Sequence, residues 1–236
     1  NHALLHHTGQ HQWYTIKNGS VEYVSRLEKI LGHRGGNIRK KAPVSSVCRR
    51  DGKVCVRANG GLAEEFDEVI FATHSDDTLS ILADADVEEK KLLGAIRYQS
   101  NDIILHADCN VMPKSRRCWS SWIYKEDQDK KSDKIDLSYW MNSLQCIPSS
   151  DPLFVSLNPI KNIKSEYIYE QTTMRHPVYD KGALKAQLEI TKINGRRQTW
   201  FCGAWMKNGF HEDGLVSSLD VAQKIKSKYS LGIAAE

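Results

Sequence analysis

Two short apolar segments constrain the fold of this sequence more than any other feature. Residues 69–72 and 199–204 are nearly continuous in apolar side chains, whereas residues 135–141 alternate apolar with polar ones. A continuous run is typical of a strand buried on both faces of a helix-covered sheet, and alternation is typical of an antiparallel strand with one face toward water. We therefore expect an α/β layer from segments near both ends, interrupted by an α+β region with an antiparallel sheet.

A turn at Asp51-Gly52 predicts the pairing of two strands. β-Branched runs at 44–50 and 53–57 flank this strong type I′ signal, so residue 50 pairs with 53 and Cys48 lies opposite Cys55. A disulfide between these two cysteines is geometrically conceivable. Two small, buried or half-buried hydrophobic residues are the expectation, because disulfides are rare in reducing compartments.

Helix signals are also clear. Ser20 is a good N-cap, an apolar stripe through Val24, Leu27 and Leu31 follows, and Gly32 is a natural stop. Similar patterns predict helices at 78–83, 86–93, 182–189 and 215–229, and strands at 102–107, 118–124, 153–157 and 166–172. Residues 125–134 are a charged hairpin loop, and no linker rich in Gly, Ser or Pro is present, so two domains would have to interleave.

Composition excludes several classes of protein. Among the 236 residues, 33 lysines and arginines face 29 aspartates and glutamates, and a net charge of +4 is too small for a nucleic-acid-binding arm. At 40% hydrophobic and 26% charged residues, the chain is expected to fold. No apolar run approaches the roughly 18–20 residues of a transmembrane helix, so we predict no membrane span.

The cysteines and histidines predict no metal site. The six cysteines contain no C-x-x-C pair and indicate reduced thiols in a cytoplasmic protein. A histidine cluster near the start lacks further ligands at metal-site spacing, and consists of His2, His6, His7 and His11. The sequence starts at Asn1, without Met or a signal peptide, so we expect a piece of a longer protein.

Few residues offer a reaction centre. His211, Glu212 and Asp213 stand between two glycines before a helix, and serve either as acid and base or as a helix cap. No G-x-S-x-G, G-x-G-x-x-G or P-loop occurs. The strand at 199–204, followed by a loop and a helix opening near Gly214, would present backbone N–H groups to electron-rich oxygens of a cofactor.

Many short motifs occur in one order along nearly the whole chain. They lie at residues 13–20, 66–74, 105–113, 119–122, 139–145, 157–159, 176–177 and 201–214, the last ending in Gly-Phe-His-Glu-Asp-Gly. In this order they resemble the flavin-containing amine oxidase family. The resemblance is to its branch of FAD-dependent oxidoreductases that includes the N-terminal oxidase-like region of plant cyclopropane-fatty-acid synthases.

The resemblance implies an incomplete Rossmann-like, NAD(P)-binding-type domain for FAD, interleaved with a substrate domain that has a mixed or antiparallel sheet. The implied domain segments are residues 1–34 for the first helix and junction, 35–83 for the FAD-domain hairpin and strand, 84–193 for the substrate domain, and 194–236 for the closing FAD-domain strand and helix. The family's G-x-G-x-x-G strand would precede Asn1. We therefore expect FAD to bind tightly only with the missing N-terminal part of the same protein.

The resemblance also implies site residues. Its cofactor contacts fall on Val44, Ala72, Gly203, Ala204, Gly214, Leu215 and Val216. Its substrate pocket falls on aromatic residues of the substrate sheet, namely Trp119, Trp122, Tyr139 and Trp140. It identifies no catalytic base, and the polar candidates are His106, His211, Glu212 and Asp213.

Three functions follow from the resemblance. The first is an FAD-dependent oxidoreductase whose flavin accepts a hydride from an amine or lipid-like small molecule. The alternative is a non-catalytic flavin-fold scaffold beside a methyltransferase domain in a lipid-modifying parent, because Ala204 replaces an acidic residue and residues 205–208 are bulky and polar. A third is a lipid or isoprenoid desaturase or isomerase.

Overall fold

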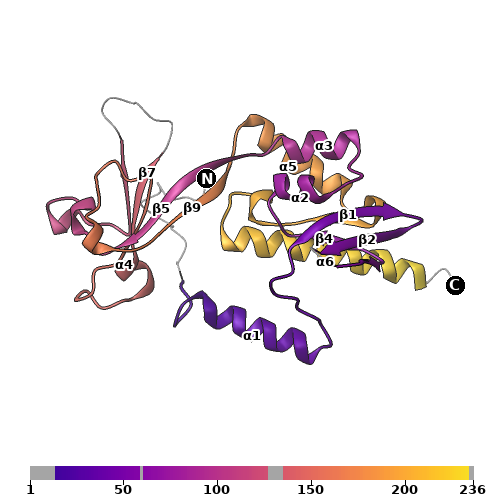
Figure 1. The fold of residues 1–236 in the computed structure, drawn as a ribbon, viewed down its shortest axis with the longest axis horizontal. Coiled ribbons are helices and arrows are strands. Elements are labelled where there is room, and N and C mark those ends of the chain that lie inside the picture. Colours follow the sequence, from indigo (N-terminus) through magenta and orange to yellow (C-terminus); the bar gives the residue numbers. More distant parts are fainter. Residues whose placement is uncertain (1–13, 59–60, 127–134, 234–236) are drawn as a thin grey trace. The chain divides into compact units, whose positions relative to one another are not determined.

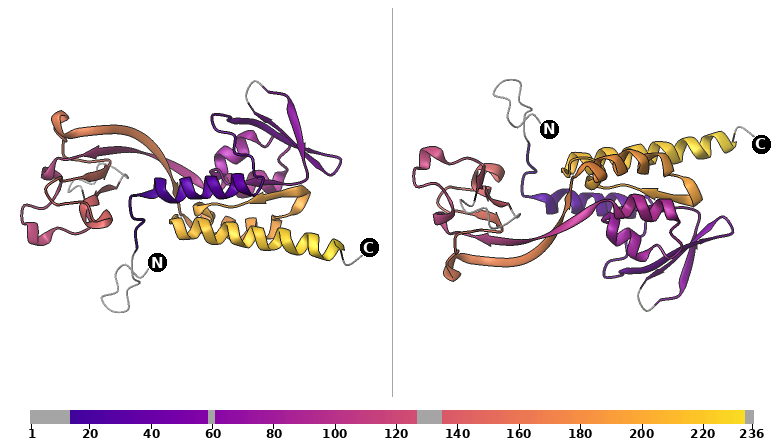
Figure 2. Two further views of the ribbon diagram at one scale, coloured as in Figure 1. Left: turned by 90° about the horizontal axis from the view of Figure 1, so that it is seen from below. Right: turned by 90° about the horizontal axis from the view of Figure 1, so that it is seen from above.

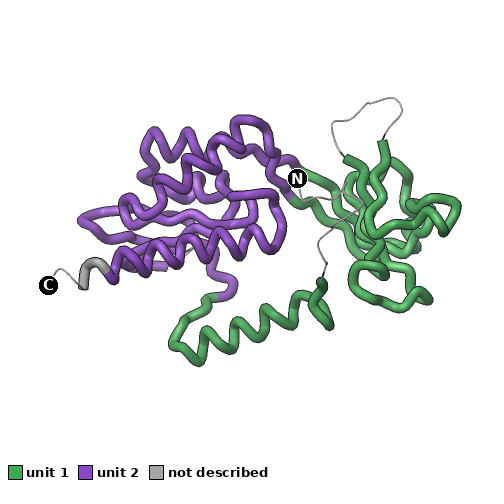
Figure 3. The backbone as a smooth tube through the Cα atoms, turned by 180° about the vertical axis from the view of Figure 1, so that it is seen from behind, with its two compact units in different colours: residues 1–39, 100–174 green, residues 40–99, 175–236 purple. Residues whose placement is uncertain are grey.

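The computed structural model describes residues 14–58, 61–126 and 135–233 (Figure 1). The histidine cluster near the start lies outside these residues. The chain forms two compact units (Figure 3): unit 1 contains residues 1–39 and 100–174, and unit 2 contains residues 40–99 and 175–236. Each unit is therefore assembled from two separate stretches of chain.

Unit 2 contains a three-stranded antiparallel sheet. Its strands are β1 (Val44–Arg50), β2 (Lys53–Ala58) and β3 (Ala63–Phe66). Asp51 and Gly52 have φ angles of 50° and 74°, as a type I′ turn requires, and Cys48 pairs with Cys55. The expected hairpin and its register are confirmed.

The second sheet of unit 2 has two parallel strands. β4 (Val69–Phe71) pairs with β10 (Thr199–Phe201), so two segments far apart in the sequence lie side by side. The expectation that the first strand is buried on both faces is wrong, because Ile70 is 50% exposed. Its exposed face has no covering layer among the described residues of this unit.

Helices cover these sheets and define the core of unit 2. They are α2 (Ser75–Ile81), α3 (Val87–Gly94), α5 (Lys181–Ile193) and α6 (His211–Ile233). Phe71 and Phe201 stack with ring centroids 5.9 Å apart, and pack with Leu93 of α3 and Ile190 of α5 in one apolar cluster. Because α3 and α5 belong to this core, the expected assignment of residues 84–193 to one domain does not match the compact units.

Unit 1 is built on a five-stranded sheet in the order β6-β7-β8-β5-β9. The strands are β5 (Arg97–His106), β6 (Trp122–Lys125), β7 (Asp136–Trp140), β8 (Phe154–Leu157) and β9 (Ile168–Val178), and α4 (Met141–Gln145) follows β7. Figures 1 and 2 show β5 and β9 side by side as two long strands. The pairs β5–β8, β8–β7 and β7–β6 are antiparallel, as the alternating pattern predicts.

The alternation in β7 has the opposite sense from the one expected. Asp136 and Ser138 are 1% and 0% exposed, whereas Leu137 and Tyr139 on the other face are only half-buried. The Asp136 carboxylate accepts a hydrogen bond from Ile160 N–H (3.0 Å), so it anchors the loop that follows β8. The polar side chains therefore face the interior of unit 1.

α1 (Ser20–His33) begins and ends as the sequence predicts, within one residue. None of its residues is buried, and the apolar stripe through Val24, Leu27 and Leu31 is exposed. Among the described residues, no helix is both long and apolar enough to cross a membrane.

Candidate functional site

The carboxyl ends of β4 and β10 lie next to the start of α6, all within unit 2. Ligands of open α/β sheets bind outside the carboxyl ends of parallel strands, and a long helix that starts there adds unpaired N–H groups. α6 has 23 residues and carries Glu212 and Asp213 in its first turn. This end of unit 2 is the candidate site.

Gly203, the second residue after β10, allows the sharp turn at this end of unit 2. Its φ of 144° is rarely adopted by other residues, and a Cβ there would lie 2.7 Å from Trp205 Nε1. The Trp205 ring is buried, and its Nε1–H donates to Thr73 O over 2.9 Å. The loop after β10 is therefore tied to the loop after β4.

A buried glutamine of α5 fixes the same loop. Gln187 Nε2 donates to the carbonyl oxygens of Trp205 (2.8 Å) and Lys207 (2.6 Å). These carbonyls belong to the turn Ala204–Met206 and to the residue after it. The turn is consequently held at two places, by the Gln187 side chain of α5 and by the backbone carbonyl of Thr73 after β4.

Asp213 closes the loop in front of α6. The residue is buried, and its carboxylate accepts hydrogen bonds from Phe210 N–H (3.0 Å) and Asn208 N–H (3.3 Å). Of the two roles that the sequence left open, this geometry favours the cap. His211 and Glu212, the other two candidates, are exposed.

Ser217 joins α6 to the end of β10. Its Oγ accepts from Gly203 N–H over 2.9 Å, and its hydroxyl hydrogen bonds to Gly203 O (3.1 Å) or Gly214 O (2.9 Å). A Cβ on Gly214 would lie 3.6 Å from Ala204 N, so the two backbones are in close approach. Gly203, Ala204 and Gly214 thus come together as one surface.

Six of the seven expected cofactor contacts belong to this end of unit 2. Ala72 follows β4, Gly203 and Ala204 follow β10, and Gly214, Leu215 and Val216 open α6. Val44 is the first residue of β1, in the three-stranded sheet.

Tyr179 lies beside the loop of the candidate site and was missed by the sequence reasoning. Its hydroxyl is buried without a hydrogen-bond partner among the described residues, and burial raises its pKa to about 12. The hydroxyl would lie 2.9 Å from a Cβ on Gly209, whose φ is 92°. The nearby His176-Pro177 motif was the available signal, but only the fold brings Tyr179 to the loop of Gly209.

A charged cluster borders this region at the start of α2. His74, Asp76 and Asp77 offer ligand atoms within 4.8 Å of one another. Arg175 already pairs with both carboxylates, bidentately with Asp77 at 2.6 and 2.7 Å, and covers the Tyr98 ring. The Arg175 guanidinium therefore already occupies both carboxylates and offsets one of the two negative charges that a metal ion would use.

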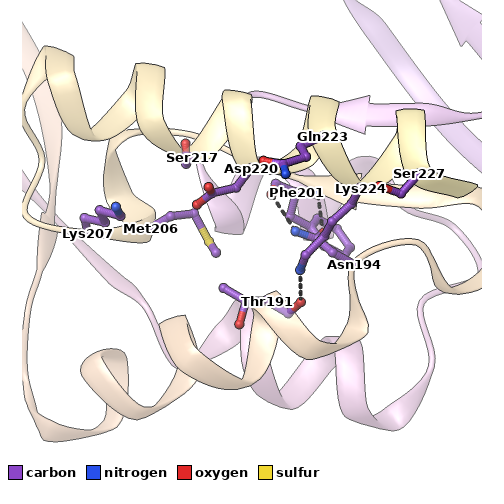
Figure 4. A pocket seen from close by; sticks show the side chains of 10 residues that line it. All are labelled: Thr191, Asn194, Phe201, Met206, Lys207, Ser217, Asp220, Gln223, Lys224 and Ser227. Atoms are coloured by element: carbon purple, nitrogen blue, oxygen red, sulfur yellow. Dashed lines mark hydrogen bonds between the residues drawn. The ribbon is translucent and has the colours of Figure 1, made fainter.

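A separate cavity of about 610 Å³ lies between α5 and α6 (Figure 4). Phe201 and Met206 form its apolar part, and polar side chains of both helices surround them. Asn194 fills the outer edge of β10 there: its Oδ1 accepts from Phe201 N–H (2.7 Å) and its Nδ2 donates to Phe201 O (3.2 Å). This amide takes the place of a neighbouring strand.

His106 of unit 1 is part of a buried hydrogen-bond chain. Its Nδ1 accepts from Asp108 N–H (3.1 Å), so the neutral ring carries its proton on Nε2 and donates to Ser156 Oγ (2.9 Å), which bonds Ser138 Oγ (2.8 Å). The side chain is 0% exposed, and burial lowers its pKa to about 4. In this arrangement His106 has no access to a substrate proton.

The four expected pocket aromatics form two pairs on opposite sheet faces. Trp119 and Trp140 meet edge to face, 5.2 Å between centroids, and pack against Phe154 in the core of unit 1. Trp122 and Tyr139 pair across β6 and β7, 6.3 Å apart, on the half-buried face. The four therefore do not line one wall.

The fold of this chain is similar to that of several solved structures, which include isomerase and oxidase chains. A CLA-producing fatty acid isomerase from P. acnes is 15% identical, with a TM-score of 0.59 over 85% of this chain and 51% of that one. A protoporphyrinogen oxidase candidate from Exiguobacterium sp. 255-15 is 14% identical, with a TM-score of 0.65 over 95% of this chain and 54% of that one. A putrescine oxidase variant redesigned in cofactor binding is 12% identical, with a TM-score of 0.60 over 89% and 53%.

At these identities the likeness concerns the fold. This chain spans about half the length of these solved chains. No family model matches the sequence, and no curated protein does.

Proposed function

We propose that this chain is part of an FAD-dependent oxidoreductase of the amine-oxidase type, in which unit 2 closes the flavin site and unit 1 supplies the substrate sheet. The observation that carries the proposal is the locked junction of Gly203, Trp205 and Thr73 beside the start of α6. When bound, the flavin accepts a hydride from the substrate.

The residues at this junction fit such a group. Gly203 lets the loop after β10 pack against the Trp205 indole, Gly214 lets the start of α6 approach Ala204, and the first turn of α6 carries the positive end of a 23-residue helix dipole. Negative charge on a phosphate or on an electron-rich ring edge is stabilised at such a helix end. The buried Tyr179 hydroxyl, which has no partner among the described residues, provides a further hydrogen-bonding group.

The small parallel sheet supports a second part of the proposal, that the remainder of the protein completes the site. Cys202 N–H donates to Phe71 O, so in this parallel ladder Phe71 faces β10 and the peptide groups of Ile70 point to the opposite edge. That edge has no partner among the described residues, and Ile70 is exposed. We infer that a further parallel strand, from the segment carrying the diphosphate-binding glycines, pairs with β4.

The half-buried face of the unit 1 sheet favours a lipid-like substrate over an amine. Every side chain that β5, β8, β7 and β6 place on this face at the paired positions is apolar or aromatic, namely Ile103, Leu105, Val155, Leu157, Leu137, Tyr139, Trp122 and Tyr124. Such a wall excludes water and orients an apolar chain by its shape. A primary ammonium group would find no counter-charge there.

The first experiment is the visible absorption spectrum of the full-length parent protein, purified without added cofactor. We expect flavin bands that bleach under anaerobic conditions with an unsaturated fatty acid and persist with a diamine. Bleaching with the diamine alone would reject the lipid-like substrate but keep the oxidoreductase. A colourless, folded protein that does not take up FAD would overturn the proposal and leave a scaffold.

A complementation experiment tests the junction itself. We expect this chain alone to bind FAD weakly, and a mixture with the separately expressed preceding segment of the parent to retain it through gel filtration. Replacement of Ile70 by Pro in this chain would remove the outward N–H of β4, and we expect it to abolish retention. Retention by the chain alone would contradict the need for the added strand.

A further inference from the structure

The three-stranded sheet of unit 2 holds two cysteines directly opposite each other. Cys48 of β1 pairs with Cys55 of β2. Along an antiparallel ladder, hydrogen-bonded and non-hydrogen-bonded pairs alternate, and the pair Arg50–Lys53 that closes the turn is hydrogen-bonded. Cys48–Cys55 is consequently a hydrogen-bonded pair, with Cα atoms about 5.5 Å apart. Disulfides span Cα distances of about 4.4–6.8 Å, so this pair falls within the range.

The turn holds the two thiols together before any bond forms. Asp51 and Gly52 adopt the positive φ angles of a type I′ turn, which fixes the register of the hairpin. Because the strands are already ordered, closing the link costs little further chain entropy. Cys48 and Cys55 are both free thiols, and both are half-buried.

The cysteines occupy the face of the hairpin that is turned away from the core. Val47 and Val54, at the neighbouring positions of β1 and β2, are buried in the apolar cluster of unit 2. A bond between Cys48 and Cys55 would therefore leave that cluster undisturbed. Burial and the nearby Cys48 thiol raise the pKa of Cys55, so Cys55 retains its proton at neutral pH.

We propose that Cys48 and Cys55 form a reversible, peroxide-responsive disulfide that locks the β1–β2 hairpin. The Cys48 sulfur attacks hydrogen peroxide, its proton passes to the leaving hydroxide, and a sulfenic acid and water form. Cys55 then attacks that sulfur, its proton leaves with the hydroxyl group as a second water, and the S–S bond forms. Two thiols and one peroxide give one disulfide and two waters, and an added dithiol reverses the bond.

The remaining four cysteines provide internal comparisons. Cys109, Cys118 and Cys146 are exposed in unit 1, and Cys202 is buried in unit 2. None of these four is paired across the ladder that holds Cys48 and Cys55. Under limiting peroxide we therefore expect the intramolecular disulfide to form between Cys48 and Cys55. The exposed Cys109, Cys118 and Cys146 should still react with the alkylating reagent once any sulfenic acids have been mildly reduced.

The test is peptide mapping of the purified protein after one equivalent of hydrogen peroxide and alkylation. Arg49, Arg50 and Lys53 lie between the two cysteines, so trypsin separates them and a link survives as two joined peptides. We expect the joined pair, lighter by two hydrogens than the sum of its parts, and its loss after dithiothreitol. Alkylated Cys48 and Cys55, or Cys48 joined to another cysteine, would overturn the proposal.

Variants separate the link from general oxidation. Cys48→Ser and Cys55→Ser should each abolish the joined peptides, and Cys109→Ser should leave them unchanged. The oxidised protein should melt several degrees higher than the reduced one, and this difference should vanish in Cys55→Ser. An equal rise in Cys55→Ser would assign the effect to another site.

Discussion

At the scale of single residues, Gly203 has the strictest requirement in the candidate site. We expect Gly203→Ala to destabilise the protein by about 2 kcal/mol or more, because φ of 144° is strained for alanine and the new Cβ would meet the Trp205 indole. Urea denaturation measures this loss. Gly32→Ala is the matched control, since nothing lies within 4 Å of its Cβ and it has no positive φ. Equal effects would show that the close contact with Trp205 is unimportant.

His106 gives unit 1 a defined response to acid. Its pKa falls from an ordinary 6.5 to about 4 on folding, so the unfolded chain takes up the proton first as the pH falls. The free energy of unfolding should therefore decrease between about pH 6.5 and pH 4, by at most about 3 kcal/mol from this group, and then level off. Urea denaturation at several pH values tests this. His106→Asn, which cannot titrate, should flatten the profile, and an unchanged profile would exclude His106 as the source.

At the scale of elements, Asn194 acts as a substitute strand for β10. We expect Asn194→Ala to cost about 1–3 kcal/mol, because the N–H and C=O of Phe201 both lose their partner. Asn194→Asp keeps the acceptor and should lose less. Chemical denaturation measures both, with exposed Asn37→Ala as the control. If Asn194→Asp loses as much free energy of unfolding as Asn194→Ala, the hydrogen bond donated by Asn194 Nδ2 accounts for the effect.

Elements were largely predictable where local signals agree with tertiary contacts. The type I′ turn fixed the register of β1 and β2, and the apolar stripe that stops near Gly32 placed α1, because both depend on neighbours in the sequence. The expected cap at Ser20 is wrong, because Gly19 is the N-cap and no side chain caps the helix. The period of β7 was also predictable. Its buried face was not, because Asp136 and Ser138 are stabilised by Ile160 and Ser156, which come from later segments.

The candidate site was predictable in part. The motif at 201–214 indicated the loop and the start of α6, yet not that Trp205 bonds Thr73 or that Gln187 holds the turn, since these are contacts between distant segments. Tyr179 was not predicted either, because its contact with Gly209 also joins distant segments. The resemblance assigned the four aromatic residues to one pocket, although strand alternation places the neighbours Tyr139 and Trp140 on opposite faces of the sheet.

At the scale of the whole molecule, each unit has its own core. Phe154 is the centre of the unit 1 cluster, and Phe201 belongs to the main cluster of unit 2. Phe154→Ala should therefore cost about 3–5 kcal/mol in unit 1 and leave amide hydrogen exchange in unit 2 unchanged. Phe201→Ala should do the reverse. Loss of protection throughout both units from either variant would show that they unfold as one.

The outer edge of β10 is bonded by Asn194, whereas the outer edge of β4 is unpaired among the described residues. The parallel sheet can therefore add another strand on one side only. A sheet that is unpaired on both sides adds copies without limit and forms fibres. Within this sheet, as far as the described residues show, two copies can pair only through β4, and once they have paired, the sheet has no unpaired edge left. On its own at high concentration, this chain should therefore stop at pairs and not polymerise through this sheet.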